Sequence, residues 1–262
     1  MTVAALLAVN ALITALAFFI LWLVACRIRD VSFVDSWWAV GLVLTAWVSF
    51  ANASPNSPHA GALIALCTLW GLRLGLYLLW RWRRQGPDRR YAAILGKAQA
   101  ARGWSFERAS LLLVFALQAP LQFIVSLPVQ LGQMTATDAG PLAYAGIALA
   151  IFGIAFEGIA DGQLVHFKRN PANKDQVLSR GLWRYTRHPN YFGDACVWWG
   201  LYLIAADTGL GVWSLPGPLL LTYLLTSWSG VPTVEGNLKR NKPGYADYVA
   251  RTSRFVPMPP RG

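Results

Sequence analysis

Long uninterrupted runs of apolar residues dominate the chain, and short polar segments separate them. The first run, residues 2–25, has no charged side chain and is long enough to cross a bilayer, which takes about 20 residues. It lacks the basic start and short apolar core of a secretory signal, so we expect it to be retained. Six further runs follow, at about 35–51, 60–80, 110–131, 141–160, 191–206 and 212–230.

No alternating pattern of the kind that membrane β-strands carry interrupts these runs. Prolines lie within some of them, which neighbouring helices tolerate in a membrane. Only 13% of the 262 residues are charged and 55% are hydrophobic, whereas soluble domains carry about 25% charge. The pattern predicts an all-α, polytopic membrane protein, in which one domain (1–262) forms seven transmembrane helices.

The basic residues predict the orientation of these helices. Lysine and arginine gather in 81–109, 161–190 and 231–262, whereas the connections 52–59, 132–140 and 207–211 contain none. The positive-inside rule then places the N-terminus outside and the C-terminus in the cytoplasm, with these three basic segments on one side. The net charge of +11 follows from this topology, so nucleic acid is not expected as a partner. A basic cytoplasmic face suits the lipid bilayer or a phosphorylated ligand.

Several kinds of site are excluded by spacing. The cysteines and histidines are dispersed without metal-ligand patterns, so we expect no metal site. Neither a P-loop nor a dinucleotide-binding glycine motif occurs. The pairs Gly71/Gly75 and Gly158/Gly162 have the spacing of small residues at close helix contacts, and we interpret both as packing positions.

The polar segment GLWRYTRHPNYFGD, residues 181–194, interrupts the apolar pattern most sharply. Pro189 suits the first position of a helix, whose N-terminus can bind phosphate. Asn190 and Asp194 lie one turn apart on that helix. Four more polar residues adjoin them: Arg184, Arg187, His188 and Tyr191. The alternative is a basic loop anchored at the headgroups, but it explains Asn190 and Asp194 poorly, because intramembrane carboxylates are costly and usually functional.

Other acids lie beside cations at the expected cytoplasmic helix ends. Glu157 and Asp161 are one turn apart before Lys168, and Glu235 precedes Lys239. Arginines, including Arg81 and Arg84, crowd the end of the third apolar run. Each group alone could be a solvated interface. Together they predict the walls of a pocket for a large, anionic, hydroxyl-rich ligand.

Asp35 lies at the start of the second run, in VSFVDSWWAVG, next to Trp37 and Trp38. One interpretation is a first-turn acid that faces the headgroups. The other is a carboxyl in an apolar, aromatic setting, which stays protonated and can donate a proton.

These motifs resemble the steroid 5α-reductase and sterol-reductase superfamily, in particular its bacterial branch. GLWRYTRHPNYFGD resembles its signature. Supporting segments are VDSWWAVG near the start of the chain, LWGLRLGLYLLWRWRR in the middle and VPTVEGNLKR near the end, so the resemblance runs in family order through nearly the whole chain. The RHPNY element is similar to a stretch with which isoprenylcysteine and phospholipid methyltransferases hold S-adenosylmethionine. Its combination with the aspartate–tryptophan element is more specific.

The resemblance implies a lipid-open cavity, NADPH as cofactor and hydride transfer to the C=C bond of a 3-oxo-Δ4 steroid. Asp35 would engage the substrate carbonyl as the catalytic residue, with Trp37, Trp38 and Trp70 around the substrate. The chain departs from the family at Trp70, where a tyrosine is expected, and at Glu157, where an asparagine is expected. The cofactor residues implied are Arg81, Arg84, Glu157, Asp161, Lys168, Asn190, Asp194, Glu235 and Lys239, with Arg184, Arg187, His188 and Tyr191 supporting phosphates and ribose.

This chemistry explains the residue types, because a phosphate-rich cofactor needs cations and a developing enolate needs a hydrogen-bond donor. A methyltransferase is the main alternative, although S-adenosylmethionine carries no phosphate and Gly236 replaces the second glutamate expected after Glu235. A non-enzymatic lipid-binding protein would leave the acids without a role. We expect a monomer in the inner membrane of a bacterium or the endoplasmic reticulum of a eukaryote.

Overall fold

The computed structural model describes residues 1–52 and 57–261, and regular structure in this part of the chain is helical. The longer helices are α1 (Val3–Ile28), α2 (Val34–Phe50), α3 (Pro58–Gln85), α4 (Arg89–Arg102), α6 (Ala116–Val125), α8 (Pro141–Arg169), α9 (Pro189–Ala206), α10 (Pro216–Tyr223) and α11 (Val231–Asn241). The short ones are α5 (Phe106–Ser110), α7 (Leu127–Leu131) and α12 (Tyr245–Arg251). Two π-helical turns, Leu111–Phe115 and Leu224–Trp228, connect α5 to α6 and α10 to α11.

The all-helical membrane architecture is confirmed. Five helical stretches within the described residues are long and apolar enough to cross a bilayer: Val3–Ile28, Pro58–Gln85, Phe106–Val125, Pro141–Arg169 and Leu210–Asn241. The other two expected spans correspond to α2 and α9. The helix α2 is apolar but has only 17 residues, and α9 has 18 residues and carries the polar positions Asn190 and Asp194 in its first turns.

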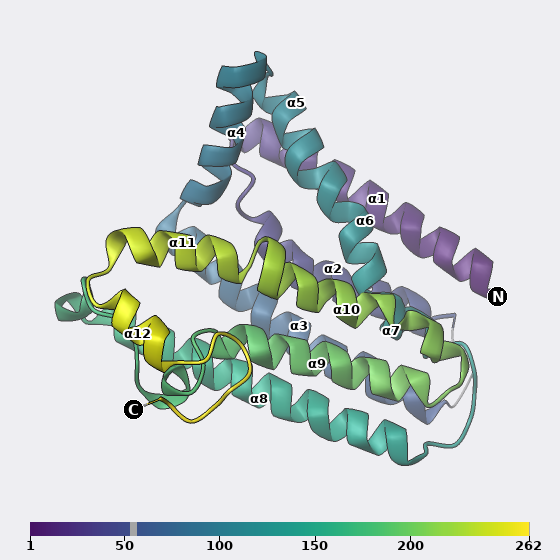
Figure 1. Ribbon diagram of the computed structural model, residues 1–262. Helices are drawn as coiled ribbons and strands as arrows, with labels where there is room; N and C mark the ends of the chain where they lie inside the picture. The colour runs from purple at the N-terminus through teal and green to yellow at the C-terminus, as the bar shows by residue number, and fades with distance from the viewer. Residues whose placement is uncertain (53–56, 262) are drawn as a thin grey trace.

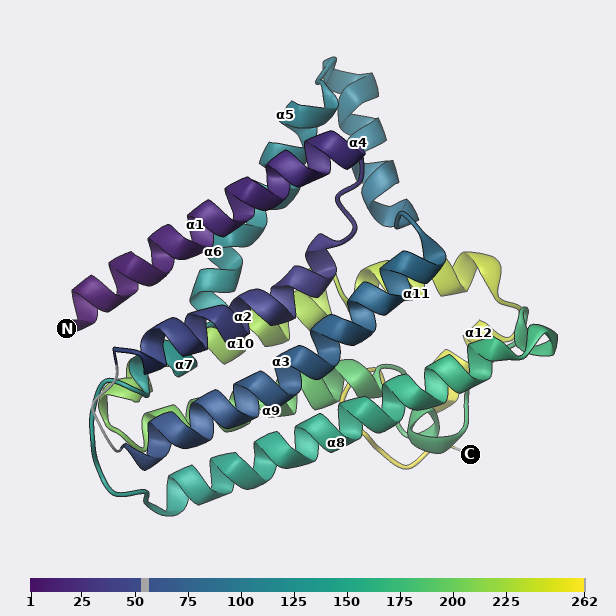
Figure 2. The ribbon, with the colours of Figure 1, turned by 180° about the vertical axis from the view of Figure 1, so that it is seen from behind.

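The helices form two packed groups (Figures 1 and 2). The larger group surrounds α9, whose buried side chains, such as Trp198 and Leu201, pack with residues of α2, α3 and α8. The smaller group joins α1 and the segment from α4 to α6 to the start of α2 through residues such as Phe18 and Phe115. Asp35 lies where the two groups meet, because α2 contributes to both.

Glycines bring α8 and α9 into backbone contact. A Cβ atom on Gly153 would lie 2.6 Å from the carbonyl oxygen of Gly193, and one on Gly193 would lie 2.6 Å from the backbone nitrogen of Glu157. Side chains therefore cannot separate the two helices along this seam. As a result, the acids of α8 lie directly against the first turns of α9.

The glycine pairs expected at helix contacts behave differently from each other. A Cβ atom on Gly71 would contact Val43 and lie 2.9 Å from the backbone oxygen of Ala39, so the packing prediction for Gly71/Gly75 is confirmed. The prediction for Gly158/Gly162 is wrong. The nearest atom to a Cβ on Gly158 is the Arg73 Cδ of α3, 3.8 Å away, and nothing lies within 4 Å of one on Gly162, so neither glycine lies at a close backbone contact.

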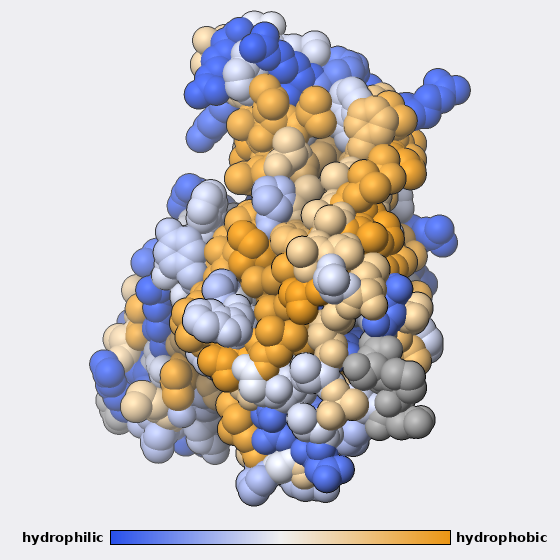
Figure 3. Space-filling model, turned by 90° about the vertical axis from the view of Figure 1, so that its right-hand side faces the viewer, coloured by the Kyte–Doolittle hydropathy of each residue, from blue (hydrophilic) through white to orange (hydrophobic). Residues whose placement is uncertain are grey.

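Much of the expected loop sequence is helical. The third helix continues to Gln85, and α8 continues to Arg169, so their basic ends lie on helices. A separate helix, α4, fills most of the basic segment 81–109. Asp88 caps its start by accepting from the backbone N–H of Arg90, and Gly103 ends it with a positive φ of 63°. Figure 3 shows hydrophobic residues over the middle of one face and hydrophilic residues at its upper end, where α4 and α5 lie in Figure 1.

Candidate functional site

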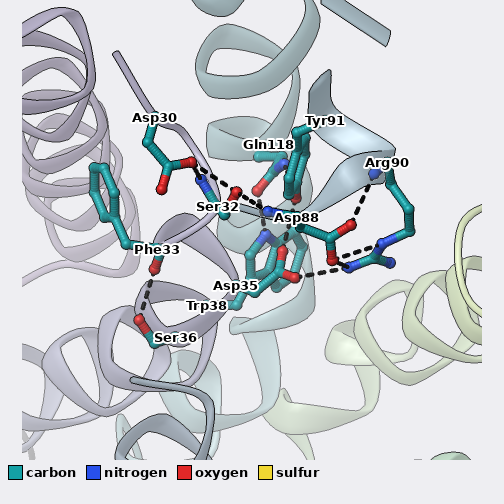
Figure 4. A network of polar contacts seen from close by, with 10 residues as sticks. All are labelled: Asp30, Ser32, Phe33, Asp35, Ser36, Trp38, Asp88, Arg90, Tyr91 and Gln118. Carbon is teal, nitrogen blue, oxygen red and sulfur yellow. Dashed lines mark hydrogen bonds and ion pairs between the residues drawn. The ribbon is translucent and has the colours of Figure 1, made fainter. Parts of the chain in front are cut away.

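Asp35, in the first turn of α2, is the centre of a polar network that joins α2, α4 and α6 (Figure 4). The hydroxyl of Tyr91 donates to one carboxylate oxygen of Asp35 at 2.7 Å, and Arg90 donates to the other at 3.0 Å. Both partners come from the first turn of α4. The position of this helix therefore decides what surrounds Asp35.

A second layer of contacts fixes these partners. Arg90 also pairs with Asp88 at 2.7 Å, and Gln118 of α6 donates to the Tyr91 hydroxyl at 3.2 Å. The indole N–H of Trp38 in turn donates to the side-chain amide oxygen of Gln118 at 2.6 Å. Burial, followed by the charge of Asp35, raises the pKa of Tyr91 well above its ordinary value, so the phenol keeps its proton.

The network gives Asp35 different surroundings from the apolar, aromatic ones expected. We expected a protonated carboxyl that donates, whereas the carboxylate accepts a phenol hydrogen bond and pairs with a guanidinium, with its side chain 25% exposed. The difference arises from tertiary structure. Tryptophans are close to Asp35 in the sequence, but the cation beside it comes from α4. Of the neighbouring tryptophans, Trp38 joins the network, while the indole N–H of Trp37 is buried without a hydrogen-bond partner.

A second polar cluster lies at the seam between α8 and α9. Arg73 of α3 pairs with Glu157 at 2.7 Å and with Asp161 at 3.1 Å. The indole N–H of Trp70 donates to Glu157 at 3.0 Å, and Asn190 donates to Asp161 at 3.3 Å. Trp70, expected near the substrate with Trp37 and Trp38, is thus a buried partner of this cluster.

The cluster has spare acceptor capacity. One carboxylate oxygen of Asp194 is shielded from water and has no hydrogen-bond donor. Glu157 and Asp161 share the single cation Arg73, and Asp194 adds a third carboxylate to their electrostatic surroundings. A buried acceptor without a donor costs free energy, so a ligand that donates hydrogen bonds, such as a ribose or a carboxamide, fits here.

A third group fastens the C-terminal part of the chain to the start of α9. Arg187 donates to Glu235 at 2.8 Å and to the backbone oxygen of Thr252 at 2.7 Å. The imidazole of His188 lies 3.2 Å from the same glutamate oxygen. Burial lowers the pKa of His188, although Glu235 counteracts this effect. The guanidinium of Arg187 is therefore engaged by the protein itself rather than free for a phosphate.

The remaining expected cofactor residues are mostly on the surface. Arg81 is half-buried, and the other four, Arg84, Lys168, Arg184 and Lys239, are exposed. Lys168 also lines a cavity of about 470 Å³ beneath α11 and α12, together with Lys174, Trp183, Arg187 and Lys242. The lysines of this lining and the ring of Trp183 suit a phosphorylated, aromatic ligand.

Tyr191 connects these groups. Its ring stacks on His188, with centroids 5.5 Å apart and planes 6° from parallel. The charges of Arg90, Arg81 and Asp35 act on its hydroxyl, as does that of Asp194. Charged groups of both the Asp35 network and the Asp194 cluster therefore influence the hydroxyl of one tyrosine.

Sequence reasoning missed four members of these networks: Arg73, Arg90, Tyr91 and Gln118. Arg73 carried a usable signal, since a charge within an apolar run is a functional candidate by itself. Arg90 and Tyr91 belong to the group after the third apolar run that was expected to line a pocket, but nothing local to them indicates that α4 returns to Asp35.

Comparison with known proteins identifies the family of the chain. The sequence profile described as "Protein of unknown function (DUF1295)" matches residues 21–252. The chain belongs to this family. This family is related to steroid 5α-reductase-like proteins. The chain is also similar to C594.04c, an uncharacterised protein of Schizosaccharomyces pombe (strain 972 / ATCC 24843), with 22% identity over 271 residues, 91% of this chain and 76% of the yeast protein. No solved structure matches the chain.

Proposed function

We propose that the protein is an NADPH-dependent reductase that reduces the C=C bond of a lipophilic enone, of the 3-oxo-Δ4 steroid type, within the membrane. One observation carries the proposal: the protein contains both a phenol held by a carboxylate and a carboxamide and, in the first turns of α9, a buried acid with an unpartnered acceptor. The first group suits a carbonyl oxygen that gains negative charge, and the second suits the polar end of a nucleotide cofactor.

The cofactor would be held by two kinds of residue. Asp161, Asn190 and Asp194 offer acceptors and an amide to ribose hydroxyls and a carboxamide. Arg81 and Lys168 lie near the C-terminal ends of α3 and α8, and such cations would bind the phosphates of the cofactor. When bound, NADPH supplies the hydride.

Tyr91 is the proposed donor to the substrate carbonyl. Its hydroxyl already accepts from Gln118 and donates to Asp35, so a small rotation would turn the O–H toward a substrate oxygen. Asp35, paired with Arg90, would orient the phenol rather than act as the donor itself. Trp37 and Trp38 of the same helix would form the apolar wall beside a flat substrate.

The membrane topology follows the same proposal. Counting α2 and α9 as spans gives seven, with the N-terminus outside and the basic ends of α3 and α8 in the cytoplasm. NADPH would then enter from the cytoplasm. The membrane would be the inner membrane in a bacterium or the endoplasmic reticulum in a eukaryote, and the bacterial reductase-like branch remains the proposed subgroup.

A methyltransferase is the second candidate, and one observation favours it. Three carboxylates, Glu157, Asp161 and Asp194, surround a single arginine, and this excess of acid suits the sulfonium cation of S-adenosylmethionine.

Binding and turnover by the detergent-purified protein test the proposal. We expect NADPH to bind, more weakly as salt rises, and to be oxidised when progesterone or testosterone is added. Tyr91→Phe should lower this rate by about 10²- to 10³-fold, the usual effect of removing one oxyanion donor, while NADPH still binds. Tyr144→Phe, at an exposed position (63%), is the matched control. Binding of S-adenosylmethionine without NADPH binding would reject the reductase in favour of the methyltransferase.

A further inference from the structure

The segment 86–110, which we call the α4–α5 arm, projects from the bundle beside the end of α1 (Figures 1 and 2). Little of α4 is buried: only Leu95 and Ala98 among its fourteen residues lie in the interior. Packing within the protein therefore accounts for one narrow face of this helix. Arg90 and Tyr91 contact Asp35, and the other side chains of α4 are exposed.

The exposed faces of the arm are cationic. Its two acids pair with arginines of the protein, Asp88 with Arg90 and Glu107 with Arg29. Four exposed basic side chains remain: Arg89, Lys97, Arg102 and Arg108. None of them has a salt bridge to a described residue, so their charge is available to a partner outside the protein.

Apolar groups accompany these cations in the arrangement typical of membrane interfaces. Arg102 and Arg108 lie 4.8 and 5.0 Å from the ring of Trp104. Ile94 is 46% exposed on α4. Tryptophan and basic side chains with apolar stems are enriched where hydrocarbon meets headgroups, and soluble partners do not require this combination.

The attachment of the arm to α1 places the arm at the boundary between the hydrocarbon core and the headgroups. The helix α1 has 26 residues, a length of about 39 Å at about 1.5 Å per residue, so one end must pass beyond a hydrocarbon core of about 30 Å. Exposed apolar residues such as Ile20 and Leu23 face the lipid along α1. The arm joins α1 at its C-terminal end, where Trp22 donates to the backbone oxygen of Glu107 at 3.1 Å and Arg29 pairs with the Glu107 side chain. Hydrophilic residues gather there in Figure 3.

We propose that the α4–α5 arm is a docking surface for the headgroups of anionic phospholipids in the surrounding membrane. The cations contact lipid phosphates, and Trp104 and Ile94 lie at the boundary with the acyl chains. The first turn of the arm carries Arg90 and Tyr91, so bound lipid also holds these residues against Asp35. The proposal concerns the arm alone and does not depend on the reaction catalysed.

Titration of the full-length protein in neutral detergent with dioctanoyl phosphatidylglycerol tests this proposal, with tryptophan fluorescence as the signal. The matched titrant is dioctanoyl phosphatidylcholine. Each cation near an anionic surface contributes the equivalent of about fivefold in affinity, from ~1 kcal/mol. The double variant Lys97→Gln/Arg102→Gln should therefore bind the anionic lipid about 25-fold more weakly. Trp104→Phe should remove the fluorescence change.

Arg251→Gln/Arg261→Gln is the control, because it removes two exposed cations from the other end of the chain. Its affinity for the anionic lipid should match that of the unmodified protein. Equal binding of the two lipids, or equal losses in the two double variants, would overturn the proposal. Inorganic phosphate that competes at the same concentration as the lipid would also overturn it, since the arm would then be an anion site and not a membrane surface.

Discussion

Arg187 holds the C-terminal segment against the start of α9, and its replacement by alanine should release that segment. The guanidinium, 8% exposed, donates to Glu235 at 2.8 Å and to the carbonyl oxygen of Thr252 at 2.7 Å. Arg187→Ala leaves a buried carboxylate and a carbonyl without donors, and breaking a buried ion pair in this way costs about 3–5 kcal/mol. Since about 1.4 kcal/mol is a factor of ten, the detached population should rise roughly 100- to 3,000-fold.

Hydrogen exchange of backbone amides measures this release directly. The amide of Met258 donates to Tyr185 at 3.0 Å, and it is freed only when the segment leaves. Its exchange should accelerate by the same factor in Arg187→Ala and stay unchanged in Arg251→Ala, where an exposed arginine of α12 is lost. Met258 exchange within threefold of the unmodified protein would show that Arg187 does not hold the segment. A loss of NADPH affinity in Arg187→Ala would then need a direct contact as its cause.

Three further predictions follow from other contacts. Gly193→Ala places a Cβ atom 2.6 Å from the backbone of α8 and should lower the free energy of unfolding by about 1–3 kcal/mol in a denaturation experiment, whereas Gly162→Ala, with nothing within 4 Å, should not lower it. Burial lowers the pKa of His188, so the neutral imidazole stabilises the folded protein fully above the unfolded pKa of about 6.5. This stabilisation should decrease as the pH falls below that value. Thermal unfolding measured across this pH range should therefore depend less on pH in His188→Asn than in the unmodified protein. In a cysteine-free background, Lys97→Cys and Asn52→Cys should be labelled by an impermeant maleimide from opposite sides of the membrane, and labelling from one side would contradict the proposed topology.

The membrane helices could be predicted from the sequence because lipid imposes a strong local rule. A spanning helix must satisfy its own backbone and present apolar side chains, so composition over about twenty residues is enough to find it. The ends of these helices were predicted less accurately, because this rule applies only to residues inside the bilayer. Helical residues beyond the bilayer, such as those to Gln85 in α3 and Arg169 in α8, carry charged side chains and look like loops when hydropathy alone is considered.

The polar contacts were only partly predictable. Asp161 and Asn190 were expected in one site, and they do form a hydrogen bond, because chemistry-bearing residues at the same ends of neighbouring helices meet. The surroundings of Asp35 could not be deduced, since they depend on how α4 turns back after Gly86. The contact of Arg187 with Glu235 was not predicted for a related reason: a cation beside a helix start suits both a phosphate and a distant glutamate of the same chain.

The glycine seam between α8 and α9 divides the molecule into parts of unequal mechanical freedom. Backbones in direct contact cannot slide without a clash, so Glu157, Asp161 and Asp194 share one fixed frame. No comparable seam ties α4 to the bundle, where side-chain hydrogen bonds to Asp35 and Ser32 make the connection. Substrates of different shape would therefore be accommodated by adjustment on the α4 side, while the acid cluster keeps a constant geometry. Variants that broaden or narrow substrate choice should accordingly concentrate in α1, α4 and α6.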